Sequence, residues 1–130
     1  MTFARPVARG ILRGVAVHFT IPAPNTAKVR AALAFCIAAR DLFSCQYCGA
    51  ANVVMQVDHV TPRAHFAASV PARVVNAPTN LVAACLGCNA AKGPQDLAGF
   101  ARMLVARGVA PAKVAAMQAR VTAATVRALP

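Results

Sequence analysis

Apolar residues recur at helical spacing in the segment that follows the N-terminal prolines. The positions that would share one helix face are Val29, Leu33, Cys36 and Ile37. Asn25 or Thr26 can cap the free backbone N–H groups at the start of such a helix. The pattern predicts a helix over residues 25–40, preceded by irregular or short extended structure over residues 1–24, where Pro and Gly interrupt the chain.

The middle of the chain contains two short apolar runs of strand length. Residues 53–57 (Val-Val-Met-Gln-Val) and 81–84 (Leu-Val-Ala-Ala) predict two strands. Residues 61–79 lie between them, hold three prolines and predict a long loop. A loop of this length inside a compact domain is usually functional or mobile.

Helical periodicity returns near the C-terminus. Residues 95–107 and about 111–128 predict two helices, broken apart by Gly108 and Pro111. The apolar positions spaced for burial are Leu97, Phe100, Leu104, Val105, Val114, Met117 and Val121. The chain therefore divides into an irregular extension (1–24), a helix plus core (25–93) and a basic, Ala-rich helical tail (94–130).

The charge of the chain is strongly one-sided. Its 130 residues include 14 Lys or Arg and 3 acidic residues, a formal net charge of +11 at pH 7. This balance favours a polyanionic partner, and nucleic acid over an anionic membrane, with a solvated basic surface as the alternative. A small, Ala-rich core stabilises a fold only weakly, so we expect an additional stabilising element such as a metal ion.

The distribution of apolar and charged residues argues against two classes, membrane-spanning proteins and secreted proteins with a signal peptide. The longest uncharged apolar run, residues 31–39, is too short to span a bilayer. Arg5, Arg9 and Arg13 leave no clean apolar stretch for a signal peptide. We therefore expect a cytoplasmic protein that is not embedded in a membrane.

Four of the 5 cysteines form two matched pairs, Cys45-Gln-Tyr-Cys48 and Cys85-Leu-Gly-Cys88. Two Cys-x-x-Cys pairs supply four thiolates, a closed tetrahedral set that suits a structural Zn²⁺ ion. The alternatives are a redox-active dithiol or ordinary buried thiols, which the repeated spacing disfavours. Cys36 stands apart on the predicted helix and is expected to be a small core residue.

Polar residues of catalytic type surround these pairs. Asp58-His59 follows the first predicted strand, Asn80 precedes the second, and Asn89 follows Cys88. A metal that clamps the two pairs together would bring Asp58, His59 and Asn89 near one another. Each has an ordinary alternative as a turn, cap or structural residue. His18 and His65 are assigned to structure or solvent.

The order of these residues resembles the HNH nuclease family. The resemblance rests on Arg40-Asp-Leu-Phe-Ser-Cys-Gln-Tyr-Cys-Gly49, Val57-Asp-His-Val-Thr-Pro-Arg63 and Asn80-Leu-Val-Ala-Ala-Cys-Leu-Gly-Cys-Asn-Ala-Ala-Lys-Gly93. It covers residues 40–93. It implies an α+β fold: a small ββα-metal, treble-clef-like core with a four-Cys zinc site, flanked by helices.

The resemblance also implies the chemistry of a metal-dependent endonuclease. His59 would be the general base, since histidine titrates near working pH. Asp58 and Asn89 would hold one catalytic Mg²⁺ or Mn²⁺ ion. Asn80 would fix the loop and orient the base.

Three cations are expected at the phosphates of duplex DNA, namely Arg40, Arg63 and Lys92, although Arg40 has Asp41 as an alternative partner. The basic tail would add salt-dependent contacts to the DNA backbone.

The loop departs from the family pattern. Many relatives carry a Gly-Gly pair after the Pro-Arg segment, whereas residues 64–74 contain no glycine. Two other functions therefore stay open: a non-catalytic, zinc-stabilised nucleic-acid-binding protein, and a subunit active only with a protein partner. In the second case the apolar stripe of the tail would be the docking surface.

Overall fold

The computed structural model describes residues 7–12, 15–20 and 27–130. The helices and strands, in chain order, are β1 Val7–Leu12, β2 Val15–Thr20, α1 Ala27–Arg40, β3 Met55–His59, α2 Ala72–Val75, β4 Leu81–Cys85, α3 Leu86–Lys92, α4 Leu97–Ala106 and α5 Pro111–Val126. Two short 3₁₀ turns, η1 Arg63–His65 and η2 Pro78–Asn80, complete the set. Among these described residues, no helix is both long and apolar enough to cross a membrane.

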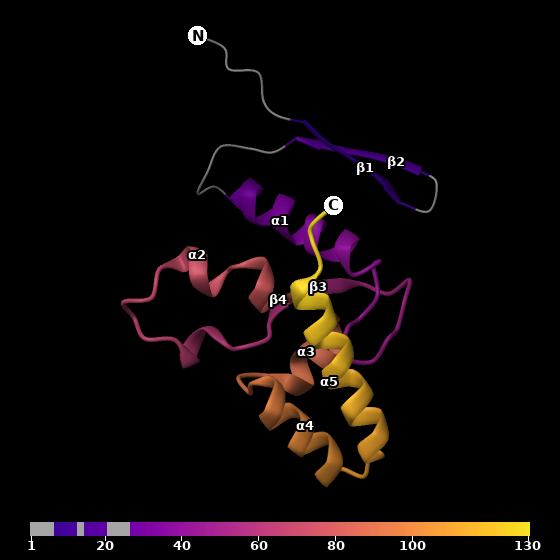
Figure 1. Ribbon diagram of the computed structural model, residues 1–130, viewed down its shortest axis with the longest axis vertical. Coiled ribbons are helices and arrows are strands. Elements are labelled where there is room, and N and C mark those ends of the chain that lie inside the picture. The colour runs from indigo at the N-terminus through magenta and orange to yellow at the C-terminus, as the bar shows by residue number, and fades with distance from the viewer. Residues whose placement is uncertain (1–6, 13–14, 21–26) are drawn as a thin grey trace.

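The core of the fold is a two-stranded antiparallel sheet of β3 and β4. The register places Asp58 opposite Val82 and His59 opposite Leu81. Helix α1 and helix α3 both contact the two strands, and α3 follows β4 directly (Figure 1). β4 is an aliphatic run whose first four residues are buried, which explains its position inside the molecule. This β3–β4–α3 unit is the ββα core that the sequence predicts, so the α+β assignment is confirmed.

The C-terminal helices pack onto this core. Val114, Met117 and Val121 of α5 are buried in one cluster with Tyr47 and Phe100. The rings of Tyr47 and Phe100 meet edge to face, with centroids 5.4 Å apart. Most of the apolar stripe of the tail is therefore covered within the chain, and a protein partner for these helices stays a prediction.

Two sequence-based expectations differ from the structure. The first strand covers Met55–His59 and not residues 53–57, because its pairing with β4 sets the register; Val53 and Val54 are exposed. Val105, expected in the tail's apolar face, is also exposed on α4.

In the N-terminal extension, residues 7–12 and 15–20 pair as an antiparallel hairpin, the extended alternative for this segment. The proposed helix caps Asn25 and Thr26 lie outside the described residues.

A buried ion pair ties the end of α1 to the start of β4. Arg40 donates from Nε to Asp41 Oδ1 at 2.8 Å and from Nη2 to the Leu81 carbonyl at 2.6 Å. Asp41 Oδ2 in turn accepts the Ala83 backbone N–H at 2.8 Å. Both side chains are almost fully buried. Breaking such a pair strands a buried charge, which costs about 3–5 kcal/mol.

We expect Asp41→Ala to lower the free energy of unfolding by about that amount, 3–5 kcal/mol, because Arg40 loses its counter-charge. Arg127→Gln is the control: its guanidinium is 3.8 Å from Asp41 and 44% exposed. This control is expected to cost less than about 1 kcal/mol. Urea unfolding of the metal-loaded proteins measures both, and equal effects would contradict the assignment.

Candidate functional site

Four cysteines form a metal-binding group at one end of the sheet. Cys45 and Cys48 lie in the turn after α1, Cys85 ends β4, and Cys88 lies in α3. Their Sγ atoms all lie within 4.8 Å of one another. In the described part of the chain this is the one group of three or more His, Cys, Asp or Glu side chains positioned to hold a metal ion.

The two cysteine pairs have the same local geometry. The backbone N–H of Cys48 donates to Cys45 Sγ, and that of Cys88 donates to Cys85 Sγ, both at 3.4 Å. Gly49 closes the first turn with φ of 79°, a left-handed conformation that favours glycine. Four such thiolates fit a tetrahedral metal ion such as Zn²⁺.

The thiols differ in their acidity. Burial raises the pKa of both Cys48 and Cys88, whereas the Cys88 N–H lowers the pKa of Cys85. Metal binding must therefore displace protons from the raised thiols. Cys36, on α1, lies outside this group, but it is only half-buried and is not part of the buried core, contrary to the expectation of a core residue.

Asp58 faces α3 and is held by two neighbours. The Tyr47 hydroxyl donates to Asp58 Oδ2 at 2.6 Å, and Lys92 Nζ lies 3.0 Å from the same oxygen. Burial and the charge of Asp58 raise the pKa of Tyr47, so this phenol stays protonated as a donor. Lys92 also donates to the His59 carbonyl at 2.8 Å and is fully buried. Its ammonium thus supports the end of β3 from inside the protein.

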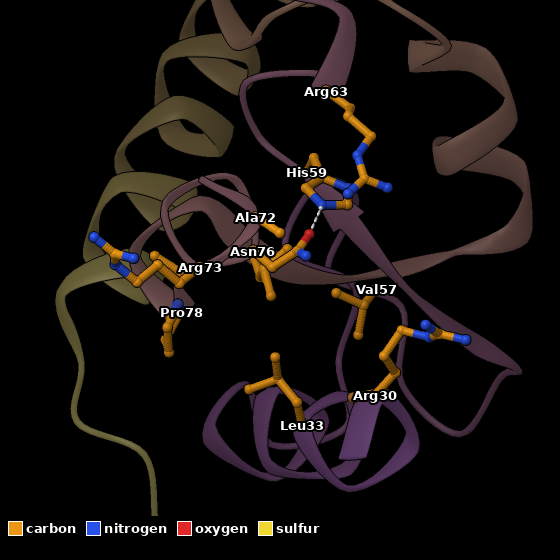
Figure 2. A pocket seen from close by; sticks show the side chains of 12 residues that line it. Arg30, Leu33, Val57, His59, Arg63, Ala72, Arg73, Asn76 and Pro78 are labelled. Atoms are coloured by element: carbon orange, nitrogen blue, oxygen red, sulfur yellow. Dashed lines mark hydrogen bonds between the residues drawn. The ribbon is translucent and has the colours of Figure 1, made fainter. Parts of the chain in front are cut away.

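His59 lies on the opposite side of β3, where the strand ends. Its Nε2 is 2.8 Å from Oδ1 of Asn76, the residue that follows α2 (Figure 2). An amide oxygen only accepts hydrogen bonds, so in the neutral imidazole this contact places the proton on Nε2 and leaves the lone pair on Nδ1. The motif pattern does not mark Asn76, and no sequence signal distinguishes it within the long loop.

Asn80 fastens the loop between the strands. Its side chain accepts the Thr61 N–H at 2.8 Å and donates to the carbonyls of Thr61 at 3.1 Å and Val75 at 2.9 Å. These bonds join the start of the loop to α2. Asn76 follows Val75 directly, so Asn80 holds in place the residue that touches His59.

Asn89 lies on the same face of the sheet as Asp58. Its Nδ2 donates to Gln56 Oε1 at 2.6 Å, and Gln56 is two positions before Asp58 on β3. Among the described residues, Asp58 Oδ1 and Asn89 Oδ1 accept no hydrogen bond. Two hard oxygen ligands fit Mg²⁺, which is often bound by one or two protein groups plus substrate phosphates. The adjacent Lys92 charge weakens the attraction for such an ion.

The three expected phosphate contacts have different environments. Arg40 is buried in the Asp41 cluster, and Lys92 is buried against Asp58 and His59, so both cations already have partners inside the protein. Arg63 is exposed beside His59. His65 is exposed as well, in agreement with its assignment to solvent, whereas the side chain of His18 lies outside the described residues.

Comparison with known families agrees with this geometry. Residues 45–95, less than half of the 130-residue chain, match the model of the HNH endonuclease family. The match begins at Cys45, the first cysteine of the metal-binding group, and ends just after Lys92 and Gly93. Comparisons with curated proteins and with solved structures give no match. The resemblance drawn from the motifs is thereby confirmed for this segment.

We expect the purified chain to hold one zinc ion, measured by elemental mass spectrometry. Cys48→Ser should lose the metal and lower the thermal midpoint, because three thiolates leave the tetrahedral site open. Cys36→Ser is the matched control and should keep one zinc per chain. Equal zinc content in the two variants would contradict the four-thiolate site.

Proposed function

We propose that the HNH segment, residues 45–95, makes this chain a metal-dependent endonuclease that hydrolyses phosphodiester bonds in duplex DNA. The observation that carries the proposal is the hydrogen bond from His59 to Asn76. It leaves one ring nitrogen with a lone pair at the end of β3, next to the exposed Arg63. The net charge of +11 supports a polyanionic substrate. The reduced-thiol zinc site suits a cytoplasmic setting.

In this mechanism His59 Nδ1 accepts a proton from a water molecule as its oxygen attacks phosphorus. The bond from phosphorus to the leaving oxygen breaks, and that oxygen takes up a proton from solvent. Arg63 would contact a phosphate oxygen as charge develops. Asp58 and Asn89 would hold the Mg²⁺ or Mn²⁺ ion, whose chemistry when bound is neutralisation of charge on the phosphate and on the leaving oxygen.

The residues that contact His59 and Asp58 would orient these two side chains. Asn76 sets the tautomer of His59, and Asn80 keeps Asn76 in place through the Val75 carbonyl. Tyr47 and Lys92 hold one oxygen of Asp58 and leave the other for a ligand. Lys92 also anchors the His59 carbonyl, so one cation supports both residues.

One observation favours a second function. Lys92 Nζ lies 3.0 Å from Asp58 and already neutralises the carboxylate that the catalytic ion requires. A chain that retained this ion pair throughout would bind nucleic acid on its zinc scaffold without cutting it. Cleavage assays separate the two functions.

Nicking of supercoiled plasmid in Mg²⁺ and in Mn²⁺ tests the proposal. We expect the wild-type protein to nick, and His59→Ala to lose at least about 100-fold in rate, as removal of a general base does. His65→Ala, which removes an exposed histidine from the same loop, should nick like the wild type. All three proteins are first shown to retain zinc.

A His59→Ala variant that nicks at the wild-type rate would refute the role of His59. If the wild-type protein binds the plasmid and never nicks it, the non-catalytic function replaces the nuclease.

Asn76 offers a second test through pH. We expect Asn76→Asp to move the acidic limb of the pH–rate profile to higher pH by about 1 unit, because a carboxylate favours the protonated imidazole, which is inactive as a base. Asn76→Leu should slow cleavage and leave both ring tautomers populated in ¹⁵N spectra. Thr79→Ala, an exposed change in the same loop, should alter neither. An unchanged profile for Asn76→Asp would contradict the contact.

A further inference from the structure

A cavity of about 690 Å³ lies beside His59. It is bounded by α1, by the end of β3 and by the loop from α2 to η2. Figure 2 shows apolar side chains, among them Leu33, Val57 and Pro78, around the interior. The volume lies within the range of small-molecule pockets and far exceeds what a phosphate group needs.

Three arginines line the same cavity, and none has a carboxylate to pair with. Arg30, Arg63 and Arg73 come from α1, η1 and α2, and no acidic residue lines the cavity. The chain has only 3 acidic side chains.

Each of these carboxylates is already used elsewhere. Asp41 pairs with Arg40, Asp58 with Lys92, and Asp96 accepts the Gly99 N–H at 2.7 Å. The three guanidinium groups are therefore available to an external anion.

We propose that this cavity receives one unpaired nucleotide of the strand being cut. The inference rests on the nuclease function and specifies its substrate further. The base would lie against the apolar wall, and the arginines would contact the flanking phosphates. A protein that follows only the DNA backbone needs surface cations but no apolar cavity. Enzymes that take a base out of the stack place it in such a pocket.

The position of the cavity links base and chemistry. His59 and Asn76 line the cavity together with the arginines, so a nucleotide bound here places its own phosphate next to His59, the proposed general base. Removing a base from the stack costs free energy, and this cost is smallest when the base is unpaired. The structure therefore points to a preference for bulged or mismatched DNA over fully paired duplex.

Binding to two dye-labelled duplexes, one fully paired and one with a single-base bulge, tests this inference. Fluorescence anisotropy is measured without added Mg²⁺ or Mn²⁺, so that no cleavage occurs; the zinc content is checked before and after. We expect the wild-type protein to bind the bulged duplex about tenfold more tightly, the scale expected when part of one base is buried against apolar side chains. Ala72→Trp, which fills the cavity from an exposed position, should abolish the difference. Arg73→Gln should reduce it.

Two controls match these variants on the C-terminal helices. Ala119→Trp on α5 and Arg102→Gln on α4 change exposed residues away from the cavity. Both should preserve the ratio of the two affinities, even if Arg102→Gln weakens binding to both duplexes. Equal wild-type affinity for the two duplexes, or equal loss for both in Ala72→Trp, would overturn the inference.

The two proposals can fail separately. A protein that prefers the bulged duplex but never nicks plasmid DNA keeps the nucleotide pocket and loses the nuclease function. A protein that nicks plasmid DNA without preferring the bulge keeps the nuclease function and loses the pocket.

Discussion

The paired thiols of Cys45, Cys48, Cys85 and Cys88 impose the constraint on which the remaining structure depends. They join the turn after α1 to the junction of β4 and α3. Because Cys85 ends β4, the clamp also fixes where that strand pairs with β3. Tyr47 lies between the first two ligands, is buried beside Phe100, and reaches Asp58 through its hydroxyl. One metal ion would thus organise the sheet, the packing of the tail and the environment of Asp58 together.

The alternation of side chains along β3 divides the proposed chemistry between two faces. Asp58 points toward α3, where Tyr47 and Lys92 hold it, and His59 points toward the loop that carries Asn76. The two residues are adjacent in the chain, and β3 ends at His59. The proposed mechanism therefore requires the phosphate to lie at this end of the strand, within reach of both residues. The cavity with its three arginines opens on the His59 side, which is the side we assign to the nucleotide.

Features with a fixed spacing could be predicted from the sequence. The two Cys-x-x-Cys pairs and the buried face of α5 follow from local patterns, and the loop-fixing position of Asn80 from the resemblance to the HNH family. The start of β3 could not be predicted correctly, because Val53 and Val54 have high strand propensity but no partner in β4. Arg40 and Lys92 look like surface cations in sequence. Asp41 is the neighbour of Arg40 in the chain, but the burial of this pair depends on the Leu81 carbonyl and the Ala83 N–H, and Lys92 meets Asp58 only in the fold. Asn76, Arg30 and Arg73 could not be identified, since no periodicity connects them with His59.

The most direct test of the central claim, that His59 is the proton acceptor, is chemical rescue of a zinc-loaded His59→Gly variant. With the imidazole removed and the rest of the site retained, plasmid nicking is expected to vanish. Added free imidazole should restore it, with a rate that follows the concentration of the neutral base. A His59→Gly protein that nicks at the wild-type rate without imidazole would contradict the account.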